Sequence, residues 1–133
     1  MRMFNAGSSA LLAVSLMAAA CGGGSSSPTT PGGGTTPPSV TNTITITAQG
    51  ASPRFIEIAV GSRVRMINND TRAHNMASDP HPAHTDCPEL NQIGLLAPGQ
   101  SRESGNMTTA RTCGFHDHDN PAVANLTGTI TIR

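Results

Sequence analysis

The sequence predicts an all-β fold, an antiparallel sandwich or barrel, formed by the residues that follow a Gly- and Pro-rich N-terminal region. Two observations predict it. Several short segments alternate β-branched polar residues with apolar residues, which is the pattern of half-buried strands, and turns rich in Gly and Pro separate them. No segment has a convincing helical period. Short strands joined by such turns are typical of sandwiches and barrels.

The first two expected strands cover residues 43–47 and 55–60. In the first strand, Ile44 and Ile46 alternate with threonines and are expected to face the core. In the second strand, every other residue from Ile56 to Val60 is apolar, so these residues are expected to face the core as well.

Two more strands are expected at residues 63–68, with Val64 and Met66 facing inward, and at residues 126–132. Residues 76–91 between these strands have no strand pattern and are rich in Asp, Pro and His. We therefore expect a long surface loop there, and loops of this length are often functional or mobile.

The N-terminus has the pattern of a secretory signal. A short positive start and an apolar run at residues 10–17 precede three alanines and Cys21. The apolar run is shorter than the about 20 residues that a membrane-spanning helix needs. The alanines followed by Cys21 resemble the lipobox of bacterial lipoproteins. This resemblance implies removal of residues 1–20 and a lipid on Cys21, which would anchor the protein at a periplasmic or cell-surface membrane; the alternative is an ordinary signal peptide cut near Ala20.

Every residue from Gly22 to Pro38 is Gly, Ser, Thr or Pro. No apolar surface is available there to offset the entropy of an ordered backbone. We therefore expect a linker at residues 21–39, and a single folded domain at residues 40–133.

Composition argues against two classes of function. Eight arginines and no lysine balance eight acidic residues, and the chain has neither Tyr nor Trp, so we expect no nucleic-acid binding. No Gly-x-Ser-x-Gly elbow or pairing of a nucleophile with a base emerges either. The chain is therefore expected to be a binding or carrier protein and not an enzyme.

The residues that can bind metal are concentrated in two short windows. These windows hold all five histidines and both cysteines of the expected domain: His74, His81, His84 and Cys87 in the first, and Cys113, His116 and His118 in the second. Imidazole and thiolate groups suit copper or zinc. The gap of two residues between Cys113 and His116 allows both side chains to turn toward one metal ion.

The expected domain resembles the cupredoxin family, the plastocyanin-like blue copper proteins. The residues that carry the resemblance, in chain order, are the strand at 55–60 followed by Gly61, the Asn-Asn-Asp turn at 68–70 with His74 after it, the Leu-Ala-Pro-Gly turn at 96–99, Cys113-x-x-His116 and the final strand at 128–132.

The resemblance implies a Greek-key β-sandwich that binds one copper ion and transfers single electrons. By the same resemblance, His74, Cys113 and His116 would be the equatorial ligands. Two imidazoles and one thiolate form a trigonal site that both copper oxidation states tolerate. The chain would then exchange electrons with a redox partner, or copper with a donor or acceptor protein, whose identity the sequence does not give.

Two features depart from the family pattern. Leu126 occupies the position of the usual axial Met and cannot ligate copper, and 12 residues separate Cys113 from Leu126, a long ligand loop for this family. His118 lies in that loop and could fill the axial position.

A disulfide is the alternative use of the two cysteines. In an oxidising compartment, two thiols in one domain usually pair. A Cys87–Cys113 bond would be worth roughly 3 kcal/mol or somewhat more in the loop-entropy model. It would exclude Cys113 as a ligand and leave a copper-holding or structural module, in which the loop with His81 and His84 captures the metal. The residues alone leave both alternatives open.

A second, weaker resemblance concerns residues 114–118. The sequence Gly-Phe-His-Asp-His looks like the strand motif of copper-zinc superoxide dismutases, in which two histidines flanking one residue bind copper. Positions i and i+2 of a strand share a face, so both imidazoles could bind one ion. This would imply an oxidoreductase acting on superoxide, but the zinc loop and the arginine of that family are not found. The alternative for His81, His84 and His118 is that they are solvated loop residues without a function in metal binding.

Overall fold

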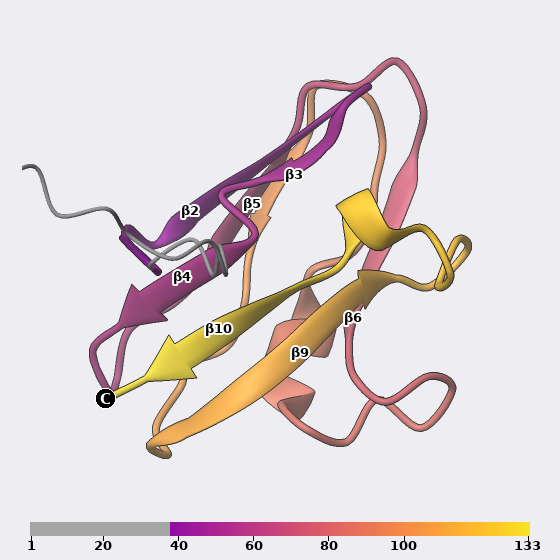
Figure 1. Cartoon of the computed structure of the whole chain (residues 1–133). Helices are drawn as coiled ribbons and strands as arrows, with labels where there is room; N and C mark the ends of the chain where they lie inside the picture. Colours follow the sequence, from indigo (N-terminus) through magenta and orange to yellow (C-terminus); the bar gives the residue numbers. More distant parts are fainter. Residues whose placement is uncertain (1–37) are drawn as a thin grey trace, which may run out of the picture. The chain divides into compact units, whose positions relative to one another are not determined.

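The computed structural model describes residues 38–133, which form two β-sheets packed face to face (Figure 1). The sandwich predicted from the sequence is therefore confirmed. The predicted signal peptide, Cys21 and the linker up to residue 37 lie outside the described residues. The first strand begins at Ser39, so the last residue assigned to the linker already belongs to a sheet.

The larger sheet has six strands, in the order β1 (Ser39–Val40), β4 (Phe55–Ile58), β10 (Gly128–Ile132), β9 (Arg111–Asp117), β6 (His74–Ser78) and β7 (Gly94–Leu96). The smaller sheet has four strands, in the order β3 (Gly50–Ser52), β2 (Thr43–Thr47), β5 (Arg65–Asn68) and β8 (Ser101–Glu103). Two short 3₁₀ helices connect strands: η1 (Pro88–Gln92) and η2 (Ala124–Leu126). Across residues 38–133, neither helix has the length or the apolar character needed to cross a bilayer.

The sheets are mixed, whereas the sequence pattern predicted an antiparallel sandwich or barrel. Strand β4 pairs in parallel with both β1 and β10, and β2 pairs in parallel with β5. The chain passes back and forth between the sheets from β3 to β6, so many neighbours within a sheet are not consecutive in sequence. Alternation of polar and apolar residues fixes which face of a strand is buried, but it does not fix the direction of the neighbouring strand.

The core between the sheets contains the residues that alternation predicted, with one exception. Ile44, Ile46 and Met66 of the smaller sheet are fully buried, as is Ile130 of the larger sheet. Val60 was expected inside but is 48% exposed. The reason is that β4 ends at Ile58, and the backbone of Val60 turns to hydrogen-bond the C-terminal residue.

Strands β6 and β9 position the candidate site. They pair antiparallel, with Ala77 opposite His116, and β9 continues into β10 through η2. The long loop expected at residues 76–91 is shorter than predicted, because β6 extends to Ser78 and η1 begins at Pro88. Residues 79–87 remain, and we call them the histidine loop.

Candidate metal site

Four imidazoles converge beside the end of β9. They belong to His81 and His84 of the histidine loop and to His116 and His118, and one ring nitrogen of each lies within 4.8 Å of the others. We call this group the four-histidine cluster. His116 is buried, His84 and His118 are half-buried, and His81 is exposed. The cluster is therefore anchored on the sheet and open to solvent at the loop.

Alternation along β9 places His116 in the cluster. Cys113 and Phe115 point into the core, where both are fully buried, so His116 points to the opposite face of the sheet. His116 is nevertheless only 2% exposed, because the histidine loop lies against it. The backbone N–H of His118, just beyond the strand, donates to the carbonyl of Asn75 at 2.6 Å.

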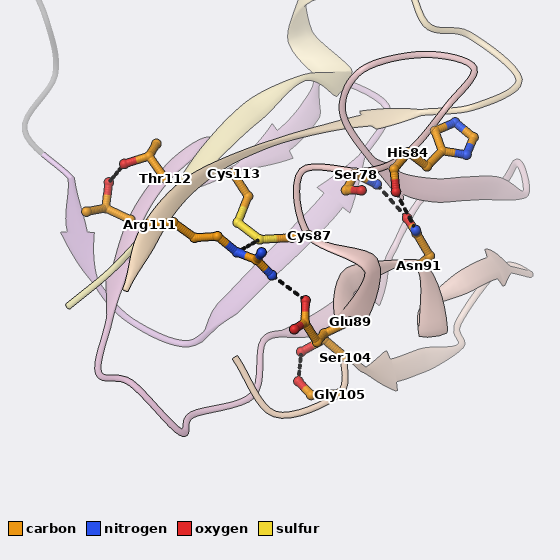
Figure 2. The surroundings of a disulfide bond; sticks show 11 residues. Ser78, His84, Cys87, Glu89, Asn91, Ser104, Gly105, Arg111, Thr112 and Cys113 are labelled. Carbon is orange, nitrogen blue, oxygen red and sulfur yellow. Dashed lines mark hydrogen bonds and ion pairs between the residues drawn. A yellow bond between two sulfur atoms is a disulfide. The ribbon is translucent and has the colours of Figure 1, made fainter. Parts of the chain in front are cut away.

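The histidine loop is fastened at both ends and near its middle. At its start, the N–H of Asp79 donates to the carbonyl of Gly114 at 3.0 Å. At its end, Cys87 forms a disulfide with Cys113 of β9. Between them, the side chain of Asn91 donates to the carbonyl of His84 at 2.9 Å (Figure 2). These attachments hold a polar, mostly exposed loop against the sheet.

Two polar contacts extend the attachment at the disulfide. The Arg111 guanidinium donates to Cys87 Sγ at 3.1 Å and to a carboxylate oxygen of Glu89 at 2.6 Å (Figure 2). The oxygen of the Asn91 side chain accepts from the N–H of Ser78 at 2.9 Å, so this one side chain joins the end of β6 to the histidine loop.

The backbone of His84 has an unusual conformation. Its φ of 52° lies in the left-handed region, which typically costs a non-glycine residue of order 1–3 kcal/mol. Its N–H donates to the carbonyl of Pro80 at 2.7 Å, which closes a tight turn. Burial lowers the pKa of His84, and the nearby imidazoles of His116, His118 and His81 lower it further, against an opposing effect of Asp79. His84 is therefore neutral at pH 7 and has a lone pair available for a metal ion.

His116 has one engaged nitrogen and one free nitrogen. Its Nδ1 lies 2.5 Å from Oδ1 of Asp79, whereas its Nε2 is buried and has no hydrogen-bond partner within residues 38–133. An unpaired buried polar atom is costly and needs an explanation. A metal ion bound in the cluster would provide the missing partner for Nε2.

His84 and His118 are already close to the spacing of metal ligands. Nδ1 of His118 lies 3.1 Å from Nε2 of His84. Metal–nitrogen bonds of 2.0–2.1 Å in a tetrahedral site place neighbouring nitrogens about 3.3 Å apart. All four ring nitrogens lie within 4.8 Å of one another, a spacing from which they could hold one metal ion.

His74 lies in a separate group, the Asp70–His74–Asp117 cluster. Its Nδ1 is 2.9 Å from Oδ2 of Asp117, and its Nε2 is 3.1 Å from Oδ2 of Asp70. All three side chains are at least 98% buried. Burial raises the pKa of Asp70, but hydrogen bonds from His74, Arg72 and the N–H of Thr71 outweigh it and lower this pKa to about 2.

Asp117 is held in the same way. Burial raises its pKa, but hydrogen bonds from His74, the Asn120 side chain and the N–H groups of Asn75 and Asp119 produce a net lowering. Both carboxylates are therefore ionised at neutral pH and face the two nitrogens of the same ring. His74 has no nitrogen left for a metal ion.

The ligand set expected from the resemblance, His74, Cys113 and His116, is not assembled in this structure. The Cys113 sulfur is bonded to Cys87, so no thiolate is available, and both nitrogens of His74 face carboxylates. Only His116 belongs to the four-histidine cluster. His118 is also a member, but as one of four imidazoles and not as the axial ligand of a thiolate site. The disulfide and the grouping of His81 and His84 with two further histidines are the arrangement described by the alternative that the residues left open.

Leu126, at the expected axial position, is a buried residue of η2 and belongs to the core.

The sequence did contain signals for the four-histidine cluster. His81 and His84 lie three residues apart in one loop, and His116 and His118 lie two residues apart at the end of an expected strand motif. What the sequence could not show was that the loop folds back against β9.

No family model matches the chain, and no curated protein matches its sequence. Its fold is similar to those of several solved structures. A mutant plastocyanin of a fern is 21% identical, with a TM-score of 0.54, over 68% of this chain and 99% of that one. A purple cupredoxin from Nitrosopumilus maritimus is 22% identical, with a TM-score of 0.53, over 68% and 98% of the two chains.

A mutant amicyanin in its reduced state is 17% identical, with a TM-score of 0.53, over 68% of this chain and 80% of that one. These similarities establish a cupredoxin-like fold, in agreement with the fold expected from the sequence.

Proposed function

We propose that this protein is an extracytoplasmic copper-binding protein that holds one copper ion in the four-histidine cluster. The observation that carries the proposal is the buried Nε2 of His116, which has no hydrogen-bond partner among residues 38–133 and belongs to a side chain grouped with three other imidazoles. We infer that the protein acts as a binding module and not as an enzyme.

Copper is the metal that this ligand set favours. Neutral imidazole suits copper, zinc, iron and nickel, and among the divalent ions copper(II) binds most tightly to a given nitrogen site. The cupredoxin-like fold supports the same choice, since the family that the sequence resembles consists of blue copper proteins. The Cys87–Cys113 disulfide supports an oxidising compartment outside the cytoplasm.

Holding or capturing copper is favoured over fast electron transfer. His116 is fixed on the sheet, but His81 is exposed and His84 and His118 are only half-buried, so these ligands can rearrange when the copper oxidation state changes. An exposed ligand also offers an entry path for the ion. The protein would receive the ion from a copper donor protein or pass it to an acceptor protein.

Single-electron transfer is the second candidate. It is favoured by the fold, because the similar fern plastocyanin is described in oxidised and reduced structures. Stopped-flow mixing of the reduced copper protein with an oxidised small redox protein separates the candidates. Rapid electron exchange supports a carrier function with a redox partner. Slow electron exchange supports a protein that holds copper. Catalysed superoxide decay in the same preparation would instead support the weaker oxidoreductase alternative.

Competition titration tests copper binding directly. Copper(II) is added to the purified full chain in the presence of a chromogenic chelator, and zinc is titrated in parallel. We expect one tightly bound copper ion per chain, with weaker zinc binding. A double variant, His84→Gly with His118→Gln, serves as the test of location. If this variant binds copper as tightly as the unaltered protein, the metal does not bind in the four-histidine cluster.

Lipid attachment at Cys21 remains part of the proposal, and the membrane is then a partner through that lipid. In a detergent phase-separation assay, the protein is expected in the detergent phase and a Cys21→Ala variant in the aqueous phase. The N-terminal mass of the unaltered protein should include acyl chains. An unmodified N-terminus would contradict lipid anchoring and leave copper binding unaffected.

A further inference from the structure

Asp79 carries the contacts that would prepare His116 for a metal. It is the first residue of the histidine loop, and its Oδ1 lies 2.5 Å from Nδ1 of His116. We propose that Asp79 is a positioning residue, which fixes the tautomer of His116 with the proton on Nδ1 and leaves the Nε2 lone pair for copper. This inference rests on the proposed function and adds to that site one residue, which contacts a candidate ligand and not the metal ion.

The tautomer follows from the chemistry of the contact. An ionised carboxylate can only accept hydrogen bonds, so Nδ1 must be the nitrogen that carries the proton. In the neutral form of an imidazole whose Nδ1 carries the proton, Nε2 is the acceptor. That atom is buried and has no partner within residues 38–133. A carboxylate bonded to the distal nitrogen also makes a ligating imidazole more basic.

Gly114 provides the space for this contact. A Cβ at residue 114 would lie 1.9 Å from Oδ2 of Asp79 and 2.6 Å from its Cγ. A side chain of any other residue would therefore push Asp79 away from β9. The position of the Asp79 carboxylate therefore depends on a glycine at residue 114.

Backbone hydrogen bonds hold Asp79 from two directions. Its N–H donates to the carbonyl of Gly114 at 3.0 Å, and its own carbonyl accepts from the N–H of Asp86 at 2.8 Å. Asp79 thus joins β9 to both ends of the loop that bears His81 and His84. The same loop and strand that position the Asp79 carboxylate therefore also position the candidate metal ligands.

The test combines a tautomer measurement with copper affinity in the full chain. Two-dimensional ¹⁵N–¹H correlation spectra of the imidazoles, recorded without metal, report the tautomer of His116. In the unaltered protein we expect Nδ1–H. Asp79→Ala should lose this preference and weaken copper(II) binding roughly 10–100-fold. Asp79→Asn keeps an oxygen acceptor, so it should retain the tautomer and bind copper with intermediate affinity.

Two further variants provide the controls. Gly114→Ala should displace Asp79 and reproduce the loss of the tautomer with the carboxylate still present. Asp86→Asn removes the same charge from the same loop, where the side chain of Asp86 is exposed, and should leave both readouts unchanged. This control separates local positioning from a general effect of charge.

The outcomes separate this inference from the proposed function. If His116 keeps the Nδ1–H tautomer in Asp79→Ala, or if copper affinity is unchanged in that variant, Asp79 is not a positioning residue. If the unaltered protein binds no copper while Asp79→Ala still loses the tautomer, the proposed function fails and the effect of Asp79 on His116 stands.

Discussion

The four-histidine cluster and the Asp70–His74–Asp117 cluster use the same pair of strands and the same residue type for different purposes. His74 begins β6, and His116 lies next to Asp117 near the end of β9. In one cluster a single imidazole is held between two carboxylates, and in the other the buried imidazole has a carboxylate on one nitrogen only. The number of nitrogens left without a partner distinguishes a structural histidine from a candidate ligand.

Strand alternation explains why neighbours in sequence join different clusters. His116 and Asp117 are consecutive, so their side chains point to opposite faces of the larger sheet. Asp117 faces the same side as the core residue Phe115 and meets His74, whereas His116 faces the histidine loop. A shift of register by one residue between β6 and β9 would turn His116 toward the core and Asp117 toward the histidine loop, and neither cluster would form.

Removal of the structural histidine should have the largest effect on stability. His74→Ala leaves the buried, ionised Asp117 without its ring partner, and loss of one member of such a pair typically costs about 3–5 kcal/mol. Chemical denaturation without metal measures this loss. The folded fraction should still bind one copper ion, and a loss of copper binding with unchanged stability would reverse the distinction between the two clusters.

Removal of the disulfide should rank next and act on the histidine loop. In the double variant Cys87→Ser with Cys113→Ser, a sequence separation of 26 residues corresponds to a loss of roughly 3 kcal/mol. Copper affinity should fall in the same variant, because the loop with His81 and His84 loses its attachment to β9. Unchanged copper affinity in the folded variant would mean that the hydrogen bonds of Asp79 and Asn91 suffice to hold the loop.

In contrast to His74→Ala, the variant His84→Gly should weaken copper binding and leave the stability of the fold almost unchanged. Glycine adopts a φ of 52° without strain, so the free energy of unfolding should change by less than about 1 kcal/mol. Copper affinity should fall at least as far as the 10–100-fold typical of losing an outer partner of a ligand. Isothermal calorimetry on the full chain measures it, and retention of full affinity would remove His84 from the ligand set.

The smallest expected effect is a pH dependence specific to the structural cluster. The pKa of Asp70 is lowered to about 2 in the folded chain, against about 3.9 for an unperturbed Asp. Its ionised form therefore stabilises the fold above pH 4, and this contribution is lost as the pH falls from about 4 to about 2. Thermal unfolding of the unaltered protein and Asp70→Asn should differ most near neutral pH and converge near pH 2. A constant difference across this range would contradict the lowered pKa.

The sequence predicted the fold more fully than the site. Alternation located the strands that include Ile44, Ile56, Met66 and Ile130, since burial on one face leaves a direct trace in the residue order. It gave neither the parallel pairs nor the exposure of Val60, because both depend on where the chain crosses between sheets.

The candidate site depended on contacts distant in sequence. The sequence analysis named the four histidines of the cluster and the Cys87–Cys113 alternative, but it did not choose between thiolate and disulfide. His74 fits a ligand motif in the sequence, whereas in the fold both of its ring nitrogens face carboxylates. Asp79 had no signal of its own, since its function depends on Gly114 across the strand pair.

The visible and electron paramagnetic resonance spectra of the purified full chain with one equivalent of copper(II) test the central claim most directly. Four imidazoles and a closed disulfide predict a weak d–d band, nitrogen hyperfine structure and no free thiol at residues 87 and 113. An intense thiolate-to-copper band in the visible, together with free thiols at these two cysteines, would contradict the account and restore the site with His74, Cys113 and His116.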